Sequence, residues 1–129
     1  MILSSIRIIT ADIQGLVKFY EGATGLAFKW FTEDFAELRT TGAALAIGST
    51  RTLALFGGNV AEAAHNRSVI IEFRVDDVDA ASKRIPAETI VQQPTTMPWG
   101  NRSLLFRDPD GNLVNFFTPV TEDAKKRFA

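Results

Sequence analysis

The sequence contains no cysteine and a single histidine among its 129 residues. The absence of cysteine excludes disulfide bonds, a thiolate nucleophile and any zinc or iron–sulfur site held by cysteine. It is consistent with a reducing compartment, so we expect the protein to be cytoplasmic. The histidine, His65, stands beside Asn66 and Arg67 with no other ligand at metal-binding spacing. We interpret it as an exposed loop residue in preference to a general base or a displaced metal ligand.

Long hydrophobic runs and long basic runs are also missing. No apolar stretch approaches the roughly 20 residues that span a bilayer. The first residues do not form a cationic segment followed by an apolar one, so no signal peptide is expected. The net charge is −1, and the longest basic run is Lys125-Lys126-Arg127, which we interpret as a solvated tail. We therefore expect neither a nucleic-acid partner nor a membrane partner.

Two segments of the chain, residues 6–20 and 71–85, repeat one pattern at an offset of 65 residues, as from Asp12 to Asp77. In each segment, residues that alternate between the two faces of a half-buried strand come first. The aspartate follows them, and after it apolar residues recur at helical spacing. An aspartate in this place can accept hydrogen bonds from the free amides of the first helical turn. The repeat therefore predicts two helices, at residues 13–23 and 78–85.

Short strand candidates follow each predicted helix. A turn at Asp108-Pro109-Asp110-Gly111 joins the last two of them, because proline presets φ and glycine accepts a positive φ. The first half has one candidate more than the second, and the candidates are residues 26–31, 35–39, 43–47 and 52–56, then 89–93, 103–107 and 113–118. We predict one domain of the α+β class, residues 1–129, built from two tandem βαβββ modules at residues 1–57 and 66–120.

Four motifs follow one another along the chain: Asp12-Ile13 through Phe19-Tyr20 to Gly25-Leu26, then residues 75–81, then Pro98-Trp99-Gly100 with Arg102, and last residues 106–114. With the half-length repeat, this series resembles the vicinal oxygen chelate superfamily, which includes glyoxalase I, extradiol dioxygenases and bleomycin-resistance proteins. The resemblance covers nearly the whole chain. It implies that the two modules form a curved mixed sheet, with helices outside and a concave cavity inside.

Metal-dependent members of that superfamily hold a divalent ion with histidine, glutamine and glutamate side chains from four strands. The resemblance maps these positions to Ser5, Ile70 and Asn115 and, within one residue, to Leu55. Divalent cations need carboxylate or imidazole ligands, which these residues do not supply. We therefore expect no metal site, no other cofactor, and no metal-dependent glyoxalase or dioxygenase activity.

Strand alternation predicts which side chains face the cavity. Arg7 and Glu72 are repeat equivalents, and we weigh an ion pair between them against two solvated charges. Trp30, Phe56 and Trp99 are candidate aromatic walls, against the alternative that such aromatic residues belong to the core. The predicted ligand-binding residues are Ser5, Arg7, Trp30, Phe56, Ile70, Glu72, Trp99, Arg102, Asn115 and Phe117; Arg74 is also expected on the inward face.

Three functions are compatible with these predictions. The first, which we favour, is metal-independent binding or sequestration of a small and aromatic or cationic molecule, as the resemblance to bleomycin-resistance proteins implies. The second is a lyase, isomerase or dioxygenase-type enzyme, with Glu72 as general base and Arg7 stabilising an anion. The third is an interaction module with a filled pocket. We also predict a homodimer, because short half-domains bury more apolar area by pairing.

Overall fold

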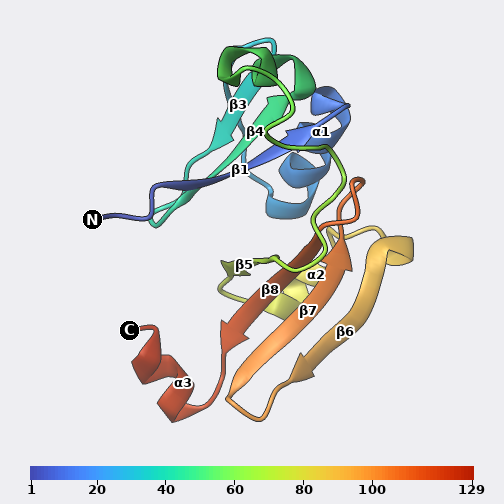
Figure 1. Cartoon of the computed structure of the whole chain (residues 1–129). Helices are drawn as coiled ribbons and strands as arrows, with labels where there is room; N and C mark the ends of the chain where they lie inside the picture. The colour runs from blue at the N-terminus through green and yellow to red at the C-terminus, as the bar shows by residue number, and fades with distance from the viewer. The chain divides into compact units, whose positions relative to one another are not determined.

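The computed structural model describes all 129 residues and resolves them into two compact units, residues 1–65 and 66–129 (Figure 1). Each unit contains a four-stranded sheet and a helix that follows its first strand. No helix of the chain is both long enough and apolar enough to cross a membrane.

The sheet of the first unit has the order β1-β4-β3-β2, with β1 and β4 parallel and the other neighbours antiparallel. Its elements are β1 (Ser5–Thr10), α1 (Ile13–Thr24), β2 (Lys29–Thr32), β3 (Phe35–Leu38), β4 (Ala44–Ser49) and the 3-10 helix η1 (Thr50–Phe56). The last strand, β4, thus returns to pair with the first, β1, which completes a βαβββ module.

The sheet of the second unit repeats this topology in the order β5-β8-β7-β6, with β5 and β8 parallel. Its elements are β5 (Ile70–Arg74), α2 (Val78–Ser82), η2 (Ala87–Thr89), β6 (Ile90–Thr96), β7 (Asn101–Arg107), β8 (Leu113–Pro119) and the C-terminal helix α3 (Glu122–Arg127). The common topology confirms the α+β class and the two tandem βαβββ modules predicted from the repeat.

The repeated aspartates begin the two helices as predicted. Asp12 accepts a hydrogen bond at Oδ1 from the backbone amide of Gly15 (3.0 Å), and Asp77 accepts the equivalent bond from Ala80 (3.1 Å). Such a cap satisfies an amide that has no partner within the helix. The first helix ends where Gly25 takes the left-handed conformation, with φ of 71°.

Each helix covers one face of its own sheet and forms a separate core there. In the first unit Leu16 and Tyr20 of α1 are buried, as are Ile47 and Leu45 of β4. In the second unit the core is aromatic, because the rings of Phe73 and Phe106 each meet Phe116 edge-on, with centroids 5.5 and 4.9 Å apart. The residues that line these cores alternate along the strands with residues of the opposite face.

The fourth strand expected in the first half, residues 52–56, is absent, and this prediction is wrong. The segment forms η1, because Ser49 accepts a hydrogen bond from the Arg51 amide and Gly57 ends the turn with φ of 87°. Apolar residues in a short run fit a strand and a tight helix equally well, so the composition of the segment did not separate them.

Two other elements differ from the predictions. Helix α2 ends at Ser82, three residues before Ile85, and continues as tight turns in which the amides of Lys83, Arg84 and Ile85 bond three residues back. The basic run at the end of the chain is part of α3 and not a tail, because Thr121 caps this helix by accepting from the Ala124 amide (3.2 Å). This helix has six residues and only one buried side chain, so its apolar residues form no periodic pattern that could be recognised in the sequence.

Candidate functional site

Each sheet has a face that its helix does not cover, and we call it the open face. In the second sheet, strand register aligns Glu72 with Asn115 and Arg74 with Phe117 on this face. Leu105 of β7 lies beside Asn115, on the side away from Glu72. The helix-facing residues between them, such as Phe116, are buried in the core.

Asn115 and Glu72 form a polar pair at the centre of this face. The Asn115 side chain donates from Nδ2 to Glu72 Oε2 over 2.8 Å. The Asn115 side chain is nevertheless almost fully enclosed, with 8% of the residue exposed, and its Oδ1 atom is buried without a hydrogen-bond partner. Leaving a buried acceptor unpaired costs about 1–3 kcal/mol. The pair therefore offers one oriented carboxylate and one unused carbonyl oxygen.

Phe117 is buried two positions further along β8, and α3 is what covers it. The ring of Phe128, at the end of α3, lies 5.1 Å from the Phe117 ring between centroids. Arg74 donates a hydrogen bond to the Phe128 carbonyl oxygen, and its guanidinium lies 5.9 Å from the centre of the same ring. At the other end of β5, Ile70 leaves about half of its surface exposed. The open face thus has an aromatic end and an aliphatic end around the polar pair.

The open face of the first sheet gathers a cation and two aromatic rings. The Arg7 guanidinium lies 4.9 Å from the centre of the Phe35 ring and 5.9 Å from that of Phe56. Gly48, beside this group in β4, has little space for a side chain: a Cβ there would lie 3.2 Å from Thr52 Oγ1 and 3.8 Å from Arg7 Cδ. Ser5 is exposed two residues before Arg7 in the same strand. Arg7 and Phe56 are therefore brought together, as candidates for one surface, within the first unit.

Two predicted residues lie on the helix-facing side of their sheets. Trp30 is in register with Ala36, a core residue, and lies beside α1. Arg102 makes a two-pronged ion pair with Asp79 of α2, through Nε at 2.8 Å and Nη2 at 2.9 Å. The hydrogen bond from Arg102 lowers the pKa of Asp79, and the same bond raises the pKa of Arg102. Neither side chain shares a face with Glu72 or Asn115.

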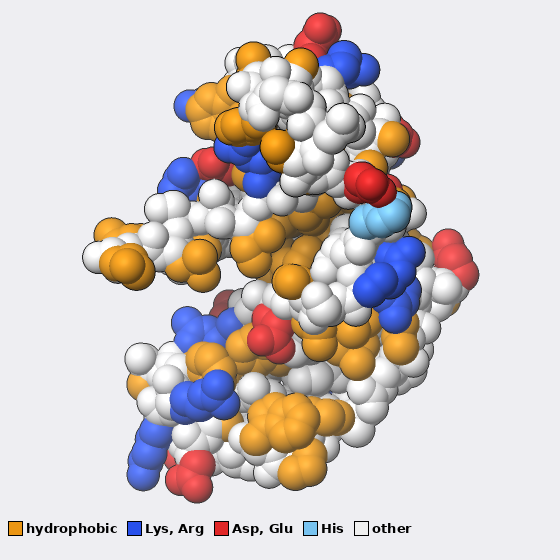
Figure 2. Space-filling view, viewed as in Figure 1, with side chains coloured by type: hydrophobic (Ala, Val, Ile, Leu, Met, Phe, Trp, Pro, Cys, Tyr) orange, Lys and Arg blue, Asp and Glu red, His pale blue; other side chains and the backbone are white.

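The remaining aromatic and histidine candidates are at the surface. Trp99 is 60% exposed in the loop between β6 and β7. His65 is exposed and lies 2.8 Å from the Glu62 carboxylate, and Figure 2 shows it as the only pale blue side chain. Arg7 and Glu72 belong to different units, so their pairing stays a prediction.

Phe35 and Phe128 were not predicted as site residues. Phe35 could have been found, because it alternates with Ala36 and so points to the opposite face from the core. Phe128 carried no such signal, since it follows a charged hexapeptide and no apolar stripe leads up to it.

The residues at the four metal positions do not fit a divalent metal ion. Ser5 and Asn115 supply neutral oxygens, and Leu55 and Ile70 supply only hydrocarbon. Asn115 Nδ2 already faces the Glu72 carboxylate. No group of three or more histidine, cysteine, aspartate or glutamate side chains is placed to hold a metal. A divalent cation requires several anionic or imidazole ligands at once, and this donor set lacks them.

Comparisons with known proteins agree with the fold. The family model described as "Glyoxalase/Bleomycin resistance protein/Dioxygenase superfamily" matches residues 2–116. A glyoxalase/bleomycin resistance protein/dioxygenase family enzyme from Burkholderia phytofirmans PsJN superimposes with a TM-score of 0.78 at 20% identity, covering 93% of this chain and all of that one. A protein of the same description from Nocardioides gives 0.74 at 22% identity, covering 95% and 85%. Among curated proteins, the uncharacterized protein YraH of Bacillus subtilis (strain 168) is 25% identical, covering 91% of this chain and 98% of YraH.

Proposed function

Because this chain belongs to the glyoxalase/bleomycin resistance protein/dioxygenase superfamily, we propose that it binds a small organic molecule, without a metal ion, on the open face of its second sheet. One observation carries the proposal: Asn115 Oδ1 is buried and unpaired beside the Glu72 carboxylate. Folded proteins rarely leave such an atom without a partner, and a ligand that donates a hydrogen bond would supply one.

The chemistry of this face indicates the kind of ligand. A donor group, N–H or O–H, pairs with Asn115 Oδ1, and the adjacent carboxylate of Glu72 favours a donor that is positively charged. Ile70 and the Phe117–Phe128 pair supply apolar area on either side. An apolar surface with a few placed polar groups is the usual design of a small-molecule site. These features support an aromatic molecule that carries an amine or amidine group.

The test is calorimetry with a panel of aromatic amines and matched aromatic acids, in the presence and absence of EDTA. An aromatic amine is expected to bind equally well with and without EDTA. Asn115→Leu, which keeps the bulk and removes the acceptor, is expected to weaken binding roughly tenfold to a hundredfold, since a hydrogen bond to a charged group contributes about 1.5–3 kcal/mol.

Asn101→Leu is the matched control for this experiment. Asn101 is also buried, its Oδ1 atom is also unpaired, and it lies at the far end of the second sheet opposite Pro119. Its replacement is expected to leave the affinity unchanged. Binding that requires an added metal, or that survives Asn115→Leu intact, would contradict the proposal.

An enzymatic function is the second candidate, and it rests on the same carboxylate. Asn115 fixes Glu72 through Oε2, which leaves Oε1 available to take a proton from a bound substrate. A lyase or isomerase reaction by a general base fits this arrangement, whereas dioxygenase chemistry would need the metal ligands that are missing. Glu72→Gln is expected to abolish such turnover while retaining binding of a neutral substrate. Retained turnover in this variant would rule out Glu72 as the base.

A further inference from the structure

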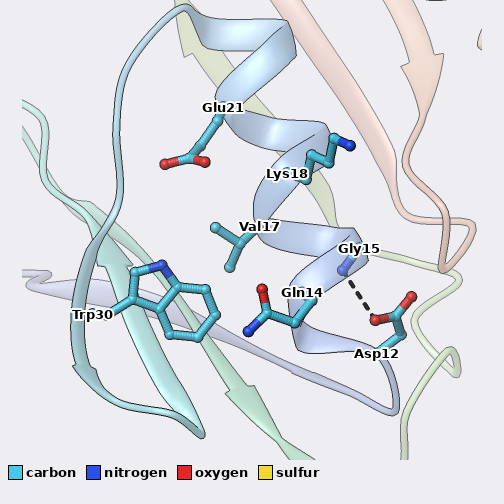
Figure 3. A pocket seen from close by; sticks show the side chains of 7 residues that line it. All are labelled: Asp12, Gln14, Gly15, Val17, Lys18, Glu21 and Trp30. Atoms are coloured by element: carbon cyan, nitrogen blue, oxygen red, sulfur yellow. Dashed lines mark hydrogen bonds between the residues drawn. The ribbon is translucent and has the colours of Figure 1, made fainter.

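The first unit contains a cavity of about 590 Å³ on the helix side of its sheet, away from the open faces (Figure 3). Its walls are one side of α1, which includes the buried Val17 and the exposed Gln14 and Lys18, and the side chain of Trp30, from the edge strand β2. A volume of this order suits a small organic molecule. Nothing in the proposed function uses this cavity.

Three side chains of α1 point from the helix toward the indole ring of Trp30: Gln14, Val17 and Glu21 (Figure 3). They follow one another at spacings of three and four residues, so they form one stripe of the helix. The Lys18 ammonium group turns away from the indole in the same view. An amide, an aliphatic group and a carboxylate therefore face the ring, while Lys18 lines the part of the cavity away from it.

Trp30 is unusually open for its place in the sheet. It is 37% exposed, whereas its neighbours on the helix side, Ala36 and Leu38, are at most 1% exposed. The reason is that β2 is the edge strand, and α1 covers the strands nearer the centre. An indole face left open in this way attracts cations through its ring quadrupole.

Glu21 carries a charge that no other side chain neutralises. Its Oε2 atom accepts a hydrogen bond from the Phe28 backbone amide (2.8 Å), which holds the carboxylate in place beside the cavity. No lysine or arginine forms an ion pair with it. A carboxylate that is fixed and unpaired next to an aromatic ring is a favourable surrounding for a cation.

In the second unit, a side chain of the protein itself lies between the helix and the sheet at the equivalent position. Gln14 corresponds to Asp79 at the repeat offset of 65, and Asp79 holds the planar guanidinium of Arg102, which reaches it from the sheet. Strand register makes Asp34 the equivalent of Arg102 in the first unit. Asp34 bonds instead to Ser49 and Arg51, so no cation reaches this space from the sheet. The one cation that lines the cavity is Lys18 of α1 itself, and its ammonium group turns away from the indole (Figure 3).

We propose that this cavity binds a planar organic cation, such as a guanidinium or an aromatic amidinium, stacked on Trp30 with its charge against Glu21. The cation takes the place that Arg102 holds in the second unit. Gln14 contributes an amide oxygen to the N–H groups at the rim, and Val17 forms the apolar floor.

Benzamidinium is the probe for this site, and benzamide and benzoate are its neutral and anionic counterparts. In ¹⁵N-labelled protein, titration with benzamidinium is expected to move the indole N–H signal of Trp30, assigned with Trp30→Phe, and to saturate. Benzamide and benzoate are expected to leave it in place. An unmoved Trp30 signal, or an equal response to benzamide, would overturn the proposal.

Substitutions test the contribution of the Glu21 charge separately from that of the Trp30 ring. Glu21→Gln keeps an oxygen for the Phe28 amide and removes the charge, so the affinity for benzamidinium is expected to fall roughly threefold to tenfold. Glu88→Gln, an exposed carboxylate of the second unit, is the matched control and is expected to have no effect. Asn115→Leu should also leave the Trp30 response unchanged, which keeps this proposal distinct from the ligand site on the second sheet. Equal binding by Glu21→Gln would overturn it.

Discussion

Asp12 and Asp77 show how single residues specify this fold twice. Both stand at the end of the first strand of a unit, and each bonds the third backbone amide beyond it. They could be predicted from sequence because the cap, the preceding strand and the following helix are all local in the chain. The contacts that define the open face of the second sheet are not local, and only part of them could be predicted.

Removal of either cap is expected to destabilise its own unit. Asp12→Ala and Asp77→Ala should each lower the free energy of unfolding by about 1 kcal/mol, since one helical amide loses its partner. Chemical denaturation measures this effect. Asp76→Ala is the control, because the exposed Asp76 neighbours Asp77 without capping the helix, and a change within about 0.5 kcal/mol is expected there. A loss as large in this control as in Asp77→Ala would show that capping is not the cause.

The ion pair between Asp79 and Arg102 predicts a pH dependence of stability. The hydrogen bond from Arg102 lowers the pKa of Asp79 below its ordinary value of 3.8. The folded state therefore favours the ionised carboxyl, and this contribution is present above about pH 4 and is lost as the pH falls through the lowered pKa. The melting temperatures of the natural protein and of Asp79→Asn should differ at pH 7 and converge as the pH falls below the lowered pKa of Asp79. A difference that stays constant with pH would exclude this linkage.

At the scale of strands and helices, the alternation of side chains along a strand predicted which face of the sheet a residue occupies wherever the strands pair in regular register. It put Glu72 and Asn115 on the same face of the sheet, and the uninterrupted pairing of β5 with β8 brings them side by side. Trp30 was predicted as an aromatic wall and not from alternation, and its register opposite the core residue Ala36 puts it on the helix-facing side. Arg102 was included as a site residue from its motif alone. Along β7 its side chain alternates with those of Ser103 and Leu105, so it lies on the other face of the sheet. Which strands pair, and in which register, cannot be seen in one sequence.

Helix α3 is expected to depend on the contact between Phe128 and Phe117. Phe128→Ala should lower the free energy of unfolding by about 1 kcal/mol, as an aromatic pair of this geometry contributes about 0.5–1.5 kcal/mol. Hydrogen exchange of the α3 amides should accelerate in the same variant, because the helix loses its anchor on the sheet. Lys126→Ala, on the exposed side of α3, is the control. Unchanged exchange in Phe128→Ala would show that other contacts, such as the buried Ala124, anchor the helix.

At the scale of the whole molecule, we expect a homodimer. Large apolar side chains remain exposed in the chain, among them Ile2 and Leu3 before β1, where Figure 2 shows orange side chains at the N-terminal end. Pairing would remove such surface from water. Light scattering at micromolar concentration should give twice the 14.2 kDa mass of the chain. Ile2→Ser with Leu3→Ser should weaken the association if this segment takes part, and a monomer of the natural chain would refute the prediction.

Each sheet takes all its strands from one half of the chain, and this has a consequence for how the protein is made. All strand pairings of the first sheet lie between Ser5 and Ser49, and those of the second between Ile70 and Pro119. Every strand pairs only with strands from its own half of the chain. On the ribosome, where synthesis proceeds at roughly 5–20 residues per second, the first sheet has all its strands some seconds before the second sheet is complete. A nascent chain arrested after the first unit has cleared the exit tunnel should therefore already resist protease at β1 and β4.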